Sequence, residues 1–537
     1  MSWRRLSARM LLVHPVREVG QALPALIGLV LAGRAMGNGQ MWWLAPLGVV
    51  AVITLSVLRW VTTTYRITPE QVQLRTGLLR RKTISTPADR VRSVHVTASA
   101  LHRLLRLAKV EIGTGSHESG SGLSLDSLGV QEAAGLRAEL LHRSAAAYSD
   151  MAGTSAPGAP AADLPGRALP VDHEAELRDD TEPKHDTEPE HDTEPDRETE
   201  LARLDPGWVR FSPFTMSGVL GAAAILGIGS RLFDQLGVSA SEVGPIRRGL
   251  DYVERNPVWV DVLQGLGALL VLVTVLSIGG YILSYWGFRL TRHPGGSLHI
   301  TRGLLTTRAT SIEERRLRGV EVAEPLLQRA VRAARLSSIT TGLKSRAGAD
   351  GGSSMLLPPA PRAVAREVAA QILRDPAPLD VALTTHGPAA RRRRFTRALL
   401  GALVLIVAAV VAISRGASPW LAPAAVLTVP VAVLLAVDRY RSLGHAIAGR
   451  YLVTRAGSLY RRRDVLECDG IIGWNVRQTF FQRRAGLATL TATTAAGRQR
   501  YAVTDVPLSQ ALSLASQALP GLLDEFLIPA PPRRLQT

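Results

Sequence analysis

Residues 298–305 read Leu298-His299-Ile300-Thr301-Arg302-Gly303-Leu304-Leu305, and a similar stretch occurs earlier as Val72-Gln73-Leu74-Arg75-Thr76-Gly77-Leu78-Leu79. In both stretches, apolar and polar residues alternate up to a glycine. This pattern predicts two strands joined by a turn, because alternation is the period of a half-buried strand and glycine permits the turn. An aromatic residue opens each region, in the phrases Tyr65-Arg66-Ile67-Thr68, Phe288-Arg289-Leu290-Thr291 and, a third time, Tyr451-Leu452-Val453-Thr454.

Each of the three regions continues with the same order of features. A polar-apolar turn leads into a strand-like segment at 101–112, 326–339 and 480–490, and an alanine- and leucine-rich stretch follows at 131–141, 363–373 and 508–519. Apolar residues recur there every three to four positions, which predicts a helix. The chain is therefore expected to contain three copies of a mainly β module with a C-terminal helix. We expect the third copy to lack the Gly-Leu-Leu turn, because Tyr460-Arg461-Arg462-Arg463-Asp464 stands there.

Long apolar runs precede the modules in pairs. A membrane-spanning helix needs about 20 mostly apolar residues, and tryptophans at the ends of runs favour the headgroup layer. Buried helices of a large soluble protein are the alternative, which six such runs disfavour. The six predicted spans are Val19–Ala35, Met41–Leu58, Phe214–Ser230, Val262–Tyr285, Ala398–Ser414 and Pro419–Val437.

The placement of arginine predicts the topology. The short loops within each pair, 36–40, 231–260 and 415–418, carry little net charge, whereas arginines cluster before the first and fifth runs and after the second. Because cytoplasmic loops carry an excess of Lys and Arg, both termini and all three modules are expected to be cytoplasmic. The sequence thus predicts a multi-pass protein of the bacterial cell membrane, and the lipid bilayer is its first expected partner.

Between the first module and the second hairpin lies a strongly acidic segment. It repeats Asp-Thr-Glu-Pro at 180–183, 186–189 and 192–195. Proline, charge and the shortage of apolar residues predict a disordered spacer; an intramolecular cover for a basic surface is the alternative. The predicted boundaries are hairpin 1 at 1–63, module 1 at 64–142, linker at 143–205, hairpin 2 at 206–285, module 2 at 286–375, hairpin 3 at 376–440, module 3 at 441–528 and tail at 529–537.

The chain of 537 residues carries a net charge of +18 and a single cysteine, Cys468, which excludes an internal disulfide framework. None of the phosphate-loop, dinucleotide, nucleophile-elbow or zinc-helix motifs occurs. The nearest polar cluster, Ser116-His117-Glu118-Ser119, is interpreted as a loop rather than a nucleophile. His173, His185 and His191 lie among carboxylates in the linker, where weak metal binding is the less favoured reading. We therefore expect a non-enzymatic protein without cofactor or metal.

The module phrases resemble the bacterial pleckstrin-homology domain of the second type. The cues are the aromatic-x-Ile-Thr opening, the Gly-Leu-Leu turn and a phrase such as Phe481-Gln482-Arg483-Arg484-Ala485-Gly486-Leu487-Ala488. With its preceding hairpins, the chain is also similar to the YdbS/YdbT-like membrane proteins. The resemblance implies an α+β membrane protein in which each hairpin is followed by a strongly bent antiparallel sheet closed by a helix. It implies little about activity, because the scaffold hosts many binding roles.

Two basic clusters occupy matching places in modules 1 and 3, namely Arg80, Arg81 and Lys82, and Arg461, Arg462 and Arg463. Pleckstrin-homology domains hold lipid headgroups with cations near such a hairpin, so these are the candidate lipid or partner contacts. The alternative is that the arginines only fix the cytoplasmic side. A nucleic-acid partner is not expected, because aromatic residues make up 5% of the chain and show no stacking pattern.

The function expected from the sequence is a scaffold whose cytoplasmic modules bind a protein partner, another copy of the chain or inner-leaflet lipid. Small residues in the spans permit close helix packing and hence a homo-oligomer. The alternative is a component of an export or resistance system for an apolar or lipid-like substrate. A proton or ion path is disfavoured, because the spans carry almost no ionisable residue at mid-depth.

Overall fold

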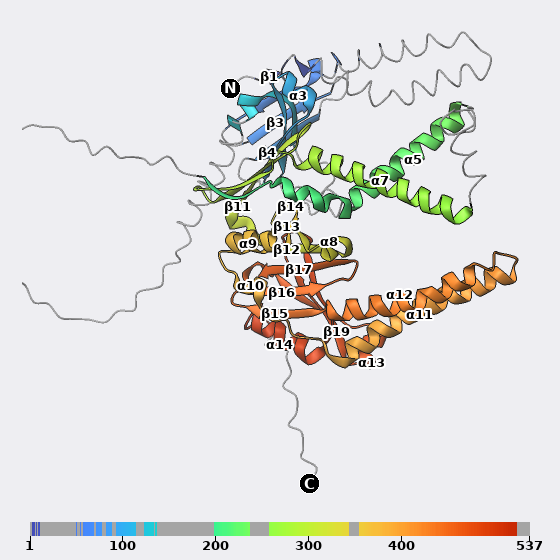
Figure 1. Ribbon diagram of the computed structural model, residues 1–537. Helices are drawn as coiled ribbons and strands as arrows, with labels where there is room; N and C mark the ends of the chain where they lie inside the picture. Colours follow the sequence, from blue (N-terminus) through green and yellow to red (C-terminus); the bar gives the residue numbers. More distant parts are fainter. Residues whose placement is uncertain are drawn as a thin grey trace, which may run out of the picture.

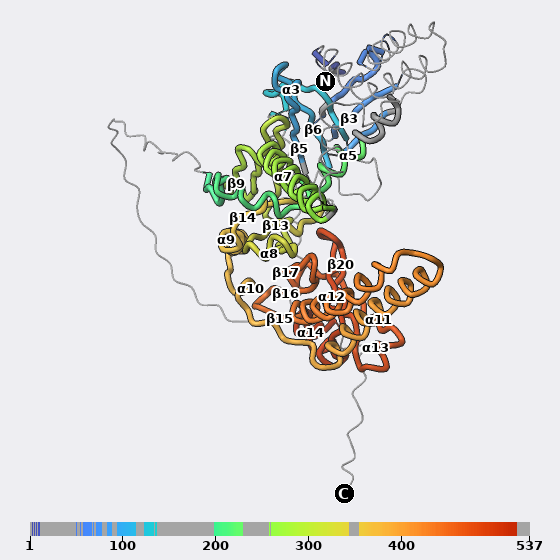
Figure 2. The backbone as a smooth tube through the Cα atoms, turned by 45° about the vertical axis from the view of Figure 1, so that its right-hand side comes forward, coloured from blue at the N-terminus to red at the C-terminus, as the bar shows by residue number. Residues whose placement is uncertain are grey.

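The computed structural model describes residues 3–5, 7, 9–10, 50, 54, 57–58, 60–68, 71–77, 82–87, 93–113, 123–133, 135–136, 198–236, 257–342 and 354–522. Its strands form a column that runs from the N-terminal part of the chain to the C-terminal part (Figure 1). Two long helix pairs, α5 (Met216–Leu236) with α7 (Val258–Tyr285) and α11 (Gly387–Ser414) with α12 (Leu421–Arg441), project from the same side of this column (Figures 1 and 2).

Each module consists of two sets of three strands, which we call the leading and the trailing set. The leading sets are β2 (Thr64–Ile67), β3 (Gln71–Thr76) and β4 (Lys82–Pro87); β9 (Arg289–His293), β10 (Ser297–Arg302) and β11 (Thr307–Glu313); β15 (Gly444–Ala448), β16 (Tyr451–Ala456) and β17 (Tyr460–Glu467). The trailing sets are β5 (Ser93–Ala98), β6 (Leu107–Gly113) and β7 (Leu123–Gly129); β12 (Leu317–Pro325), β13 (Ala333–Thr340) and β14 (Met355–Pro361); β18 (Gly473–Arg477), β19 (Leu487–Thr493) and β20 (Arg500–Pro507).

The trailing sets also contain or precede helices. A five-residue helix separates its first two strands, as α3 (Ala100–Leu104), α8 (Leu326–Ala330) and α13 (Phe480–Arg484). Longer helices, α9 (Arg362–Leu373) and α14 (Leu508–Ala518), follow the second and third sets, as the periodicity predicts. The short α10 (Ala377–Asp380) and the 3-10 turns η5 (Glu314–Arg316) and η6 (Cys468–Gly470) complete the modules.

The leading sets also receive a strand from before their hairpins. β1 (Arg4–Arg5) pairs with β2, β8 (Thr199–Arg203) pairs with β9, and Thr384 forms a single bridge to His445 at the start of β15. In modules 2 and 3, the described helix pair therefore lies in the chain between an initial paired segment, β8 or Thr384, and the rest of the leading set, whereas the sequence predicted that each hairpin precedes its whole module. The structure also corrects the predicted linker, whose last residues form β8 because Leu201 packs on the core. Such short strands carry too few residues for a periodic signal.

The sheets cross the module boundaries. The trailing set of module 1 joins the leading set of module 2 in one seven-stranded sheet, ordered β7-β6-β5-β11-β10-β9-β8. The trailing set of module 2 joins the leading set of module 3 in the six-stranded sheet β14-β13-β12-β17-β16-β15. At the two ends of the column remain the four-stranded sheet β1-β2-β3-β4 and the three-stranded sheet β18-β19-β20. All described strand pairs are antiparallel. Because two of the sheets contain strands of two modules, successive modules are joined by strand pairing as well as by the chain.

The two junctions between modules, β5–β11 and β12–β17, have the same register. In module 2, the fourth residue after the turn glycine Gly303 is Thr307, and it faces Ala98, the fourth residue before His102 of α3. In module 3, the fourth residue after Gly457 is Arg461, and it faces Glu324, the fourth residue before Gln328 of α8. The seventh positions match in the same way, as Thr310 with His95 and Asp464 with Glu321. The pairing between modules is therefore a repeated element of the fold.

The turn from the second to the third leading strand is built on glycine in all three modules. Gly77, Gly303 and Gly457 have φ values of 108°, 108° and 104°, which L side chains rarely adopt. A Cβ on Gly457 would lie 2.0 Å from the carbonyl oxygen of Tyr460. The expectation that module 3 lacks this turn is therefore wrong: Gly457-Ser458-Leu459 forms it, and only the residue after the glycine has changed.

Within the residues that the structure describes, three helices are long and apolar enough to cross a membrane, namely Trp259–Tyr285, Gly387–Ser414 and Leu421–Arg441. The predicted span at Phe214–Ser230 differs, because the 3-10 helix η3 (Pro206–Phe214) meets α5 at a bend of 60°, and the two qualify only as a pair. Pro213 within η3 lacks a donor N–H and favours such a break. The predicted spans Val19–Ala35 and Met41–Leu58 lie almost wholly outside the described residues, so six spans stay a prediction.

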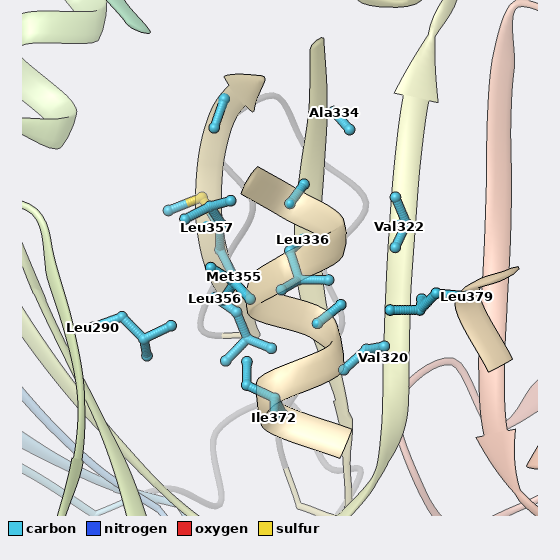
Figure 3. Close-up of a cluster of buried hydrophobic side chains, with 14 of the residues drawn as sticks. Leu290, Val320, Val322, Ala334, Leu336, Met355, Leu356, Leu357, Ile372 and Leu379 are labelled. Carbon is cyan, nitrogen blue, oxygen red and sulfur yellow. The ribbon is translucent and has the colours of Figure 1, made fainter. Parts of the chain in front are cut away.

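The largest buried cluster lies in module 2 and the start of module 3. Helix α9 covers the trailing strands, and its Ile372 lies beside Leu356 in the same buried cluster as Val320 and Leu336 (Figure 3). Tyr451 and Val465 of module 3 belong to the same cluster. Because each buried aliphatic side chain contributes about 1.5–3 kcal/mol, this shared core makes modules 2 and 3 one packed unit.

Candidate membrane and partner surface

The turns on Gly303 and Gly457 lie where the modules meet the long apolar helices. Gly303 N donates to Trp286 O at 2.9 Å, and Leu304 N donates to Leu283 O at 3.0 Å, so the module 2 turn rests on the end of α7. The preceding module contacts the same turn, because Arg103 Nη1 of α3 donates to Leu304 O at 2.6 Å.

The second junction repeats this contact with another donor. Leu326 N, at the start of α8, donates to Leu459 O in the module 3 turn at 2.8 Å. The turn of one module therefore lies on the short helix of the module before it, at both internal junctions.

Large apolar side chains project from these turns and short helices. Leu305 and Leu459 in the turns are 54% and 57% exposed, and Phe480 and Phe481 on α13 are 66% and 72% exposed. Leu104, Leu326 and Leu327 are exposed on the other short helices. In Figure 1, α8 and α13 lie on the side of the column from which the helix pairs project, and α9 and α10 lie on the opposite side. We call this set of apolar side chains the helix-side face.

Arginines accompany the apolar residues on α13. Arg483 and Arg484 of this helix are exposed, and the helix is held by a capping box in which Thr479 and Gln482 satisfy each other's backbone groups. Arg393 Nη2 of α11 donates to Thr479 Oγ1 at 3.4 Å, which holds α13 against the base of α11. Aromatic and arginine side chains next to each other at the base of an apolar helix suit the interface between water and lipid.

Of the candidate contacts Arg461–Arg463, the first couples a module to the long apolar helix α12. Arg461 Nη2 lies 3.1 Å from Asp438 Oδ1, and Arg329 Nη2 of module 2 lies 3.0 Å from the same oxygen. Ser458 Oγ donates to the other oxygen of Asp438 at 2.8 Å. One carboxylate near the end of α12 thus holds modules 2 and 3 together.

Arg463 is held by backbone carbonyls. Its Nη2 donates to Pro378 O at 2.9 Å and to Val381 O at 3.1 Å, and burial lowers its pKa to about 10. Arg462 lies over the ring of Tyr460 at 5.8 Å. The structure therefore gives Arg461 and Arg463 contacts that stabilise the junction. Arg80 and Arg81 lie outside the described residues and Lys82 begins β4, so a lipid or partner contact at the two clusters stays a prediction.

The four antiparallel sheets, the helices that follow the trailing strands of modules 2 and 3, and the register shared by the two junctions can now be compared with known families. The bacterial PH domain matches three stretches, at residues 15–144, 243–375 and 396–520. The chain belongs to the bacterial PH domain family. No curated protein and no solved structure matches it.

The junction between the second and third PH modules contains a pair of carboxylates. Glu321 of β12 and Asp464 of β17 face each other directly, and Arg498 bridges them, with Nε 3.2 Å from Glu321 and Nη2 2.7 Å from Asp464. Burial, with the nearby Asp464 charge, raises the pKa of Glu321. This PH–PH junction thus accepts like charges in opposed positions when a third group compensates them.

A pair of buried histidines lies at the base of hairpin 3. His386 Nδ1 is 3.0 Å from Thr504 O, and His445 Nδ1 is 3.0 Å from His386 Nε2. Since a carbonyl only accepts, His386 carries its proton on Nδ1 and its Nε2 accepts from His445. Burial, with the neighbouring His386, lowers the pKa of His445 to about 4, and burial also lowers that of His386.

Nothing in the described part of the chain gathers three or more metal-ligating side chains. Cys468 is buried, and burial with the nearby Asp469 raises its pKa to about 11, so it stays a thiol at neutral pH. Ser116–Ser119 and the linker histidines lie outside the described residues. The sequence reasoning missed the helix-side face, although aligning the PH modules on their turn glycines places Leu305 with Leu459, and Leu327 with Phe481.

Proposed function

We propose that this PH protein is a non-enzymatic membrane scaffold, which uses its hairpins and the helix-side face to hold three modules against the inner leaflet of the bacterial cell membrane. Both termini and all modules lie in the cytoplasm in this proposal, in keeping with the bias of arginine. The modules then present their sheets and outer helices to a protein partner. No nucleic acid, metal or cofactor takes part.

The observation that carries the proposal is the exposure of Phe480 and Phe481 at the base of α11. Soluble surfaces rarely gather several large apolar residues beside one another without a partner. Here they lie beside Arg483 and Arg484, on the side from which the apolar helices project. An anionic leaflet offers both the apolar layer and the negative charge that such a helix needs, at about 1 kcal/mol per basic residue.

The scaffold role rests on the continuity of the modules. Modules 2 and 3 share a core and a sheet, and Asp438 links them to a membrane helix. Such a unit holds several binding surfaces at fixed distances, whereas flexibly linked modules do not.

A depth measurement tests the membrane contact. Full-length Phe481→Cys protein, labelled with an environment-sensitive fluorophore, is reconstituted into vesicles that contain anionic lipid. We expect quenching by lipids that carry a quencher near the headgroup. Gln510→Cys on α14 serves as the matched exposed control and should give little quenching, and the native Cys468 is buried.

Equal quenching at positions 481 and 510 would overturn the proposed orientation. The scaffold role is tested separately, by placing a photo-crosslinking residue at the exposed positions 363 on α9, 510 on α14 and 476 on β18 in native membranes. A defined crosslinked product supports a scaffold, and a diffuse set of abundant neighbours at every position contradicts it.

A further inference from the structure

The edge strands β4 and β18 belong to the two sheets at the ends of the column, one to each sheet. Within the described part of the chain, β4 and β18 have no strand on their outer sides. β4 is the counterpart of β11 and β17, and β18 is the counterpart of β5 and β12, which are the strands that pair with them. The two ends are therefore the two halves of a junction that the chain forms twice internally.

The side chains of β18 are more exposed than those at the matching positions of β12. Val322 on β12 is 5% exposed where β17 covers it, whereas Val476, at the same position of β18, is 41% exposed. Asn475 and Arg477 on either side of it are also exposed. A partner strand on the outer side of β18 would give these residues the burial that their counterparts already have.

Within the described residues, no turn of a following module contacts α13, the short helix next to β18, whereas such a turn contacts α8. At the second junction Leu326 N donates to Leu459 O. Phe480 is the counterpart of Leu326, and its N–H is one of the helix-start donors that need an acceptor from outside the helix. The counterpart of the Leu459 turn is the stretch Gly77-Leu78-Leu79 before β4.

We propose that copies of this chain assemble head to tail, with β18 of one copy paired antiparallel to β4 of the next. The inference rests on the proposed scaffold function and names its partner as a second copy of the chain. Counting from Gly77 and from Gln482 as in the internal junctions places Thr83 opposite Val476 and Ile84 opposite Asn475. The start of β4 then lies beside α13, as the start of β17 lies beside α8 at the second internal junction.

The positions of the two edges require that the pairing be between copies. β4 belongs to the sheet at one end of the column and β18 to the sheet at the other end (Figure 1). A head-to-tail contact uses two different surfaces and generates a ring or a filament. The internal junctions leave the helix pairs on one side of the column, so an assembly that continues them keeps every copy in the same bilayer.

Cysteine crosslinking tests the register. Two tagged full-length chains are produced in one membrane, one with Thr83→Cys and the other with Val476→Cys. Residues directly opposite in a sheet bring their Cβ atoms to within reach of a disulfide, whereas diagonal neighbours do not. We expect mixed dimers, with Ser85→Cys plus Val476→Cys as the shifted control giving at least about ten-fold less product. Ile84→Cys with Asn475→Cys is a second matched pair.

The same experiment separates a head-to-tail contact from its alternatives. Each single variant alone should give no dimer, because the contact is not symmetric; the double variant should give a ladder. Dimers of Val476→Cys alone, or equal yields from the matched and shifted pairs, would overturn the inference. A crosslink from position 476 to a different protein would also overturn it while leaving the scaffold function intact, and failure of the depth measurement would affect only the scaffold function.

Discussion

The β12–β17 junction and the outer edge of β18 are built from the same local pattern but end in opposite environments. In the junction, the side chains of β12 are covered by β17, and Leu326 N at the start of α8 bonds the following turn. At β18, the matching side chains and the matching helix residues Phe480 and Phe481 face outward. The comparison teaches that the exposure of Val476 on the strand reflects the absence of a neighbouring leading set, whereas the short helices present apolar side chains at both places, since Leu326 and Leu327 of α8 are also exposed.

The largest expected effect comes from breaking the closed junction at its turn. Gly457→Ala places a Cβ 2.0 Å from Tyr460 O at a φ of 104°, which should destabilise module 3 by about 4 kcal/mol. The urea midpoint of the full chain in detergent, followed by tryptophan fluorescence, reports this loss. Gly449→Asn is the control, because the φ of Gly449 is 55° and no atom lies within 4 Å of its Cβ position; a similar loss there would contradict the steric explanation.

A somewhat smaller loss is expected when the charge that bridges the junction is removed. Arg498→Gln leaves Glu321 and Asp464 opposed and buried, at a cost of about 3 kcal/mol at pH 7. Because the pKa of Glu321 is already raised, its carboxyl takes up a proton as pH falls, so the difference from the unmodified chain should shrink toward pH 5. Arg500→Gln, at an exposed residue of the same strand region, is the control. A loss that does not change with pH would contradict the repulsion between the two carboxylates.

The sequence predicted the repeated modules and their closing helices, because alternation and helical periodicity are local signals. It did not predict that β5 pairs with β11 or β12 with β17, since the pairing partner of a strand leaves no trace in its own period. The turn on Gly457 was missed for a related reason. The turn needs only a glycine with a positive φ, and Gly457 meets this need. Because Ser458 stands where the other modules have leucine, the sequence did not match the Gly-Leu-Leu pattern.

The candidate site was predicted only in part. Arg461 and Arg463 stand in a conspicuous basic run, but Asp438 and the carbonyl of Pro378 are distant in sequence, so the sequence did not reveal the internal contacts of these arginines. Phe480 and Phe481 would count as core residues on hydropathy alone. Their counterparts Leu326 and Leu327 are exposed as well, so the outward position of these apolar side chains is a feature of the short helices that only the structure reveals.

The buried pair His386 and His445 is expected to make the free energy of unfolding depend on pH. The unfolded chain binds protons near pH 6.5, whereas the folded pKa of His445 is about 4, so the stability present above pH 6.5 is lost as pH falls toward 4. Between pH 7 and pH 5 the loss should be about 2 kcal/mol. His445→Gln should flatten the dependence of the urea midpoint on pH, and an unchanged slope in this variant would show that the pair does not cause it.

The smallest effect, and the one most specific to the open edge, concerns charge. The inferred register places Lys82 of one copy opposite Arg477 of the next, and like charges directly opposite cost about 0.2–1 kcal/mol. The internal junction solves the same problem with Arg498 between Glu321 and Asp464. Arg477→Glu should therefore raise association between copies by about two- to five-fold at low salt, measured by energy transfer between labelled copies in vesicles.

Lys82→Glu should raise association by a similar factor, and the double variant Lys82→Glu with Arg477→Glu should return to the original value, because the charges are again alike. Arg483→Glu changes the net charge equally but lies on α13, outside the paired strands, so it should not respond to Lys82→Glu. Independent effects of the two reversals would show that residues 82 and 477 do not face each other. The charges of Lys82 and Arg477 would then not affect the pairing of β18 with β4. In that case β18 would be covered in another register or by another partner.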